Sequence, residues 1–460
     1  MNAPHVTDLL ALDRDVARAH AAWSRWRRAL ASDPEGKEDE APLDHYRHVA
    51  GQSVYEALGA GAPGAADAPH RAALRRWIYA LTQARIAQPL VAERAKIAAE
   101  ESGHATHPNV PRRPHLASWK QAWTGLLTAT TAAERASWLA VAIERAPAIK
   151  SIARRQEERR LEVAQRMRFE AGDPLFDLSD ADLATAAEAL LARTEDLARD
   201  LLAKARRAAE MDEDPPLATD AIAIAVARDA PEGWPARLGW PWFEATFGPF
   251  LRGLRLSAIP LPEALGASSF ALGCAAFGGA LRVAGASPSL PFTLAREPEF
   301  TAMHRFGYVF GALPASAAFQ RRILGNLARV ADAQARVLLR TGLMTARFEA
   351  ARFLLGLDAA ADRFEELTLR LFGAPLPRVL AGAWPARRED GRALLTGLLT
   401  AHALADELVQ RFDVDWFANP RAILHVRSIA SGPAREAPLE PGTLAGAIAT
   451  LGRAFEETLG

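Results

Sequence analysis

Residues 179–210 read SDADLATAAEALLARTEDLARDLLAKARRAAE, and this stretch decides the fold class. Ser179 followed three residues later by Asp182 is typical of a helix N-terminus, because each side chain can accept a hydrogen bond from the other residue's backbone N–H. Small or apolar residues then recur every three or four positions and line one helix face: Leu183, Ala187, Leu190, Leu191, Thr194, Leu197 and Leu201. The stretch therefore predicts one long amphipathic helix packed on a core.

The same spacing continues through most of the 460 residues, whereas β-branched runs bounded by turn residues are almost absent. The sequence therefore predicts an all-α protein. At about 150 residues per domain, this length allows about three domains or one large two-lobed fold. Prolines, glycines and acidic residues interrupt the helical pattern between residues 211 and 242. This interruption predicts an N-terminal helical lobe over residues 1–235 and a second helical lobe over residues 236–460.

Charge and cysteine content exclude several classes of partner. The 55 Lys and Arg residues balance 55 Asp and Glu residues, so no net field attracts nucleic acid or an acidic membrane. The single cysteine, Cys274, excludes an intrachain disulfide and multi-cysteine zinc sites. The N-terminus lacks the pattern of a signal peptide, and we interpret the uncharged, Ala- and Gly-rich residues 264–281 as a buried helix. We therefore expect a cytoplasmic protein with no nucleic-acid or membrane partner.

Short motifs give little sign of common enzyme chemistry. The sequence contains no GxSxG, P-loop or HExxH pattern. Gly59, Gly61 and Gly64 match GxGxxG, but a helical segment precedes them where a dinucleotide site requires a strand, so we interpret them as a loop. Two groups of histidines have spacing that zinc ligands can have, and we interpret both as surface histidines because neither has an evident further ligand: His45 with His48, and His104 with His107 near His115.

Residues 262–313 contain the most informative pattern. The segment AAFGGAL at 275–281 resembles the HExGHAL zinc helix of the thimet oligopeptidase and oligoendopeptidase family of zinc metallopeptidases, with Gly278 and Ala280 at the family's Gly and Ala. Residues 303–313 resemble the helix that carries the family's third zinc ligand. The chain around residues 347–357 and 394–412, and onward to the C-terminus, also resembles the family's catalytic domain.

When the resemblance is carried over position by position, the residues at the zinc-ligand and catalytic positions cannot support zinc chemistry. Ala275 stands at the first zinc-binding His, Ala276 at the catalytic Glu and Gly279 at the second His. His304 stands at the third ligand, a Glu in the family, or Arg305 does if the register shifts by one residue. Alanine and glycine offer no lone pair, and without Zn²⁺ a water molecule keeps a pKa near 16 instead of about 7.

This sequence also offers few residues that could serve as the family's oxyanion donors. The resemblance implies Tyr or His donors on the C-terminal helices, because such side chains stabilise the tetrahedral intermediate. No tyrosine follows Tyr308, so only His402 and His425 remain as candidates. We interpret both as ordinary histidines.

The resemblance implies a large two-lobed helical metallopeptidase-like fold with a central cleft, residues 262–313 forming a degenerate zinc-helix region. It further implies a catalytically inactive homologue with no cofactor, zinc being the cofactor of active relatives, and a cleft that binds a peptide or a protein partner. Two alternatives stay open. One is an active metal-dependent peptidase that uses an unrecognised site. The other is a helical interaction scaffold unrelated to peptidases, in which AAFGGAL is a small-residue helix packed closely against a neighbour.

Overall fold

The computed structural model describes residues 8–32, 41–59, 66–103, 119–129, 131–166, 178–209, 217–225, 234, 239–254, 256, 267–358, 360–383, 388–435 and 439–459. In these ranges every regular element is a helix, which confirms the all-α prediction. The α-helices are α1 Leu9–Ser32, α2 Gln52–Gly59, α3 Ala68–Gly103, α4 Trp119–Thr128, α5 Ala132–Arg166, α6 Asp180–Arg193, α7 Glu195–Ala208, α8 Ala218–Ala225, α9 Trp240–Thr246, α10 Ala267–Gly285, α11 Phe292–Ala295, α12 Thr301–Gly311, α13 Ala317–Arg322, α14 Ala328–Leu357, α15 Ala361–Phe372, α16 Arg388–Phe412, α17 Pro420–Ser431 and α18 Pro441–Leu459. Short 3-10 helices are η1 Pro42–Tyr46, η4 Gly248–Leu251, η5 Leu313–Ala315, η6 Arg378–Leu380 and η7 Trp416–Ala418.

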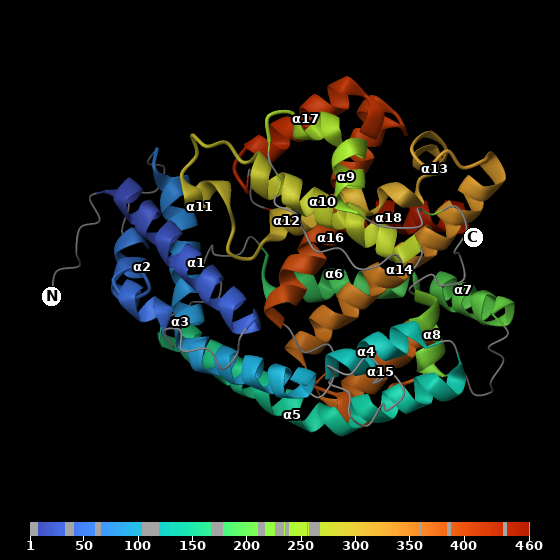
Figure 1. Cartoon of the computed structure of the whole chain (residues 1–460), viewed down its shortest axis with the longest axis horizontal. Coiled ribbons are helices and arrows are strands. Elements are labelled where there is room, and N and C mark those ends of the chain that lie inside the picture. Colours follow the sequence, from blue (N-terminus) through green and yellow to red (C-terminus); the bar gives the residue numbers. More distant parts are fainter. Residues whose placement is uncertain are drawn as a thin grey trace.

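The N-terminal helices α1, α2 and α3 lie together at one end of the molecule, and α10, α12 and α16 lie near its centre (Figure 1). Helix α11 contacts both α1 and α3, so it joins the N-terminal helices to the C-terminal part of the chain. The largest core cluster combines side chains of α5 to α8 with side chains of α14, α15, α16 and α18. Residues on both sides of position 235 therefore share one core, and the boundary between the two lobes stays a prediction.

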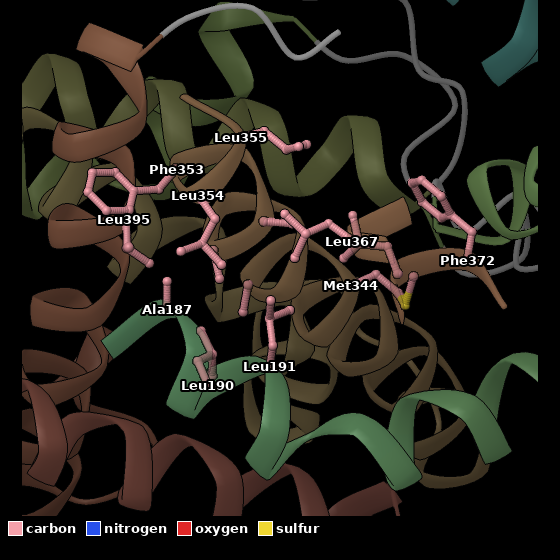
Figure 2. Packing of buried hydrophobic residues seen from close by; sticks show 14 of the residues in the cluster. Ala187, Leu190, Leu191, Met344, Phe353, Leu354, Leu355, Leu367, Phe372 and Leu395 are labelled. Atoms are coloured by element: carbon pink, nitrogen blue, oxygen red, sulfur yellow. The ribbon is translucent and has the colours of Figure 1, made fainter. Parts of the chain in front are cut away.

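Helix α6 begins where the sequence predicts. Ser179 Oγ accepts a hydrogen bond from Asp182 N at 3.0 Å, and Asp182 Oδ2 accepts one from Ser179 N at 3.0 Å. The first part of the predicted apolar face is buried with side chains of α14 and α16, and Figure 2 shows Ala187, Leu190 and Leu191 among the side chains of this core. Leu197 and Leu201 of the same predicted face are only partly buried. The capping pattern and the apolar face as far as Thr194 are therefore confirmed.

The prediction of a single helix over residues 179–210 is wrong, because the helix is interrupted at Thr194. The cause is Arg347 on α14, which is fully buried and donates from Nη1 to Leu191 O and to Thr194 Oγ1, both at 2.8 Å. In a continuous helix Leu191 O would accept from Glu195 N instead. Arg347 also donates from Nη2 to Arg370 O at 2.7 Å. Burial lowers the pKa of Arg347 to about 10, so it remains a cation at neutral pH.

Helices α10 and α12 pack with their backbones in close approach. A Cβ atom at Gly278 of α10 would lie 2.4 Å from Phe306 O and 2.9 Å from Phe310 Cβ, both on α12. From the other side, a Cβ atom at Gly307 of α12 would lie 3.3 Å from Ala275 O. Because real Cβ atoms do not approach a carbonyl oxygen to 2.4 Å, this helix pair needs glycine at position 278.

Over residues 267–281 the interpretation as a buried helix agrees with α10, except that Leu272 is exposed. Cys274, Phe277 and Leu281 of α10 are fully buried in the second core cluster, among aromatic side chains of α9, η4 and α12. Within the described ranges, no helix has both the length and the apolar character that crossing a bilayer requires.

Candidate functional site

The positions that the resemblance assigns to zinc ligands lie where α10 meets α12. A Cβ atom at Gly279 would lie 3.1 Å from Met303 Cγ, and Ala275 Cβ lies 3.1 Å from the position of a Cβ atom at Gly311. Both positions therefore face α12 across a tight helix contact. Ala275, Gly279 and the neighbouring Ala276 supply no metal-binding atom, so the residues present do not fit zinc.

His304 lies on a different face of α12. A Cβ atom at Gly397 of α16 would lie 2.7 Å from His304 Cβ, so this part of His304 packs against α16. Met303, which contacts Gly279 of α10, is one residue earlier and therefore about 100° away around the helix axis. One turn after His304, burial and the charge of Glu349 raise the pKa of Tyr308 well above its usual value, with Arg352 acting in the opposite direction.

The remaining histidine candidates lie on different segments of the fold. Burial lowers the pKa of His402 on α16 to about 4, which makes this ring neutral at neutral pH. His425 on α17 has Nε2 3.1 Å from Glu407 Oε1, and His48 has Nε2 3.7 Å from Asp15 Oδ2. No group of three or more His, Cys, Asp or Glu residues in the described part of the chain is placed to hold a metal ion. Some candidate positions lie outside the described residues: His104, His107, His115, Gly61 and Gly64.

A cluster of charged side chains that the motif search missed lies at the N-terminal end of α12. Its members come from α3, α10, the α11–α12 connection, α12, α16 and the segment after α17. We call it the charge cluster, and it consists of Arg76, Arg282, Glu297, Glu299, Arg305, Arg392 and Arg435.

Within the charge cluster, Glu297 interacts electrostatically with Arg76, Arg282 and Arg305. Its Oε2 atom also accepts a hydrogen bond from Ala302 N at 2.8 Å in the first turn of α12. Burial raises the pKa of Glu297 against these favourable interactions. The cluster therefore holds a carboxylate at a helix N-terminus, where the helix dipole favours negative charge.

Glu299 is the most strongly perturbed carboxyl group of the charge cluster. Burial and the neighbouring charge of Glu297 raise its pKa to about 7, although Arg76 and Arg392 act in the opposite direction. Many protein atoms surround the Glu299 side chain, yet it keeps partial contact with solvent. Its charge therefore changes near neutral pH while it stays in contact with water.

Arg76 and Arg435 carry like charges that act on each other. Burial, followed by the charge of Arg76, lowers the pKa of Arg435 to about 10. Burial also lowers the pKa of Arg76, although Glu299 and Glu297 act in the opposite direction. Both arginines keep partial contact with solvent, as do Glu297 and Arg305. The cluster thus combines depth in the protein with access to water.

The backbone beside the charge cluster is strained. Phe300 directly follows Glu299 and has a φ of 62°. This value lies in the left-handed region, which residues other than glycine rarely adopt. The residue is 40% exposed, so burial of its side chain does not explain the conformation. Strain of this kind concentrates at functional sites, because the surrounding structure must hold it in place.

Three sets of hydrogen bonds fix the segments that carry the charge cluster. The carboxylate of Asp13 on α1 accepts from Phe292 N and Thr293 N, each at 2.9 Å, at the start of α11. Trp77 Nε1 donates to Arg296 O at 2.9 Å, and Ala434 N donates to Leu294 O at 2.8 Å. Segments that are far apart in the sequence are thus held against one short stretch around α11.

The charge cluster combines guanidinium groups with carboxylates, and two of its arginines also have partners outside it: Arg392 pairs with Asp180, and Arg282 donates to Ala430 O at 3.0 Å. No sequence motif marks it, because its members come from six separate segments. Comparison with known proteins gives no further guidance: the chain matches no protein-family model, no curated protein and no solved structure.

Proposed function

We propose that this chain is a catalytically inactive relative of the oligopeptidase-type metallopeptidases and that it binds a peptide at the charge cluster. The observation that carries the proposal is that Glu299, Arg76 and Arg435 are partly exposed while partial burial and neighbouring charges shift the pKa of each of them. A fold that only needed to be stable would gain from apolar side chains at these positions, because burying charge costs several kcal/mol per ion. Ionisable groups with perturbed pKa values are typical of binding and active sites.

The residues at the corresponding zinc-ligand positions support an inactive protein. Ala275, Ala276 and Gly279 supply no electron pair for a metal and no base for a water molecule. Without a metal or a base at these positions, the charge cluster can still recognise a ligand. Its arginines can pair with carboxylates, and its glutamates can pair with N–H groups or cations. We retain the cytoplasmic location as part of this proposal.

A peptide suits the charge cluster better than a folded partner does. An extended chain is narrow, presents backbone N–H and C=O groups along its length, and can enter between helices. A folded domain would instead contact the rim, where isolated charge pairs contribute little to affinity.

The test is retention of a pool of random decapeptides with free C-termini on the immobilised full chain, followed by mass spectrometry of the eluted peptides. We expect the chain to enrich a subset of the pool over bare matrix and to release those peptides uncleaved. The variant Glu299→Phe places an apolar ring in the charge cluster. It should lower retention about tenfold, as expected when about 1.4 kcal/mol of binding free energy is lost.

The matched control is Glu440→Phe, because Glu440 is exposed on the segment before α18. This variant should retain the pool as the unmodified chain does, and melting curves should show that both variants fold. Retention no higher than on bare matrix would contradict peptide binding. Recovery of cleaved peptides would contradict the inactive assignment.

A further inference from the structure

We propose that a pocket between α10 and α17 binds a small amphiphile, a short alkyl chain that ends in a carboxylate. The two helices contact each other (Figure 1), and the pocket between them has a volume of about 380 Å³. Its lining combines three leucines with one arginine and two serines: Leu254, Leu281, Leu424, Arg427, Ser428 and Ser431. None of these six residues belongs to the charge cluster, so this proposal is independent of the proposed peptide site.

Close packing and hydrogen bonds fix the frame of the pocket. Gly285 and Ala430 also line it, and a Cβ atom at Gly285, the last residue of α10, would lie 2.9 Å from Ala430 Cβ. Arg282 Nη1 donates to Ala430 O at 3.0 Å, and Ser287 N donates to Ser431 O at 3.1 Å. The walls are therefore held in place before a ligand enters, which lowers the entropic cost of binding.

Arg427 supplies the positive charge of the pocket. Its Nη2 donates to Arg252 O at 2.6 Å, and this bond fixes the guanidinium group against the segment that follows η4. A guanidinium group carries five N–H donors, and Arg427 makes no other hydrogen bond or ion pair with protein groups in this structure. The side chain is only partly buried, so its remaining donors are available to a ligand.

The head group of the ligand follows from the polar lining. No Asp or Glu is among the described residues that line the pocket, so Arg427 is not neutralised by a carboxylate of the lining. The exposed hydroxyl of Ser428, on the next residue of α17, adds a donor. A planar guanidinium group matches a carboxylate in a two-bond geometry. This combination favours a carboxylate over a neutral or cationic head group.

The tail of the ligand follows from the leucines. Leu281 is fully buried, whereas Leu424 is 64% exposed on the same pocket. Single exposed leucines are common on protein surfaces, but Leu424 shares a pocket with two other leucines. An alkyl chain lying in the pocket would cover its side chain and remove apolar surface from water. No aromatic ring is among the described lining residues, which favours an aliphatic tail over one that must stack.

The volume limits the size of the ligand. Small-molecule sites have volumes of about 300–1,000 Å³, and this pocket lies near the lower end of that range. It therefore suits one short alkyl chain better than a lipid with two long chains.

The experiment is isothermal titration of the full chain with hexanoate, octanoate and 1-octanol. Each titration is repeated with Arg427→Gln and with Leu424→Ala. The control for the arginine is Arg421→Gln, because Arg421 is exposed on the same helix and does not line the pocket. The control for the leucine is Leu369→Ala on α15, where Leu369 is 49% exposed. Melting curves establish that each variant folds.

We expect octanoate to bind about tenfold more tightly than hexanoate, because two further methylene groups are buried. It should also bind about tenfold more tightly than 1-octanol, which lacks the charge that Arg427 recognises. Arg427→Gln should remove the preference for octanoate over 1-octanol. Leu424→Ala should weaken the binding of both about threefold. Both control variants should bind as the unmodified chain does.

Three results would overturn the proposal. The first is that the unmodified chain binds no octanoate. The second is equal affinity for octanoate and 1-octanol, which would exclude recognition of the head group by Arg427. The third is an equal loss in Arg421→Gln and Arg427→Gln, which would show that surface charge, and not the pocket, attracts the ligand. If Arg427→Gln fails to fold, Leu424→Ala decides, and unchanged affinity in that variant would overturn the proposal.

Discussion

Replacing Gly278 with alanine should lower the free energy of unfolding by about 2 kcal/mol. The added Cβ atom would lie 2.4 Å from the backbone oxygen of Phe306, so α10 and α12 would have to move apart. Overpacking of this kind costs about 3 kcal/mol when backbone must shift. Alanine recovers about 1 kcal/mol of that cost because it favours the helix more than glycine does. Urea denaturation followed by circular dichroism measures the difference.

The matched control is Gly446→Ala on α18. A Cβ atom at Gly446 would meet no other atom within 4 Å, and the residue is exposed, so only the helix preference changes. This variant should be more stable by about 0.5–1 kcal/mol. Equal effects of the two substitutions would show that α10 and α12 are not packed as closely as described.

Replacing Arg347 with methionine should lower the free energy of unfolding by about 4 kcal/mol. Methionine preserves most of the side-chain volume, so the loss comes from the hydrogen-bond acceptors that Arg347 now satisfies: Leu191 O, Arg370 O and Thr194 Oγ1. Each buried acceptor left without a partner costs about 1–3 kcal/mol, and removing the buried cation offsets part of the sum. Chemical denaturation at neutral pH measures this effect.

The control for Arg347 is Arg199→Met on α7, whose side chain is 66% exposed and pairs with the exposed Asp196. Its effect should stay within about 0.5 kcal/mol, because exposed ion pairs contribute little. A loss below about 1 kcal/mol for Arg347→Met would mean that solvent reaches the acceptors at the junction of α6 and α7.

Local patterns in the sequence predict the helices well, because the interactions that form a helix are close in sequence. Ser179 and Asp182 are three residues apart, and their mutual hydrogen bonds follow from that spacing. The break at Thr194 depends on Arg347, which lies 156 residues beyond Leu191. The spacing of apolar residues carries no information about a contact this far away in the sequence, so the break could not be predicted.

The charge cluster was missed for the same reason. Arg76, Glu299 and Arg435 belong to segments that only the fold brings together, and each alone looks like one of many surface charges. One signal was present in the sequence: Glu297 and Glu299 directly precede the helix that the resemblance singles out. Acidic residues before a helix are common, however, since they favour its N-terminus.

The resemblance and the close packing give different reasons for the glycine at position 278 of α10. Gly278 is required by its contact with Phe306 O, so its match to the family's glycine follows from packing alone. This observation favours the scaffold alternative. Packing does not explain why Glu299, Arg76 and Arg435 gather at one place while remaining partly exposed, which supports a ligand-binding site at the charge cluster. The peptide-retention experiment therefore separates the two functions.

The central claim of the proposal is that the helix pair α10–α12 lacks the atoms needed to hold a catalytic metal, so that the protein binds a peptide without cleaving it. Elemental analysis of the full chain, purified without chelator and dialysed against metal-free buffer, tests this claim most directly. We predict a zinc content far below one equivalent per chain, because Ala275 and Gly279 replace both histidines that the resemblance implies. About one tightly held equivalent of zinc per chain, lost when His304 is replaced by alanine, would contradict the account.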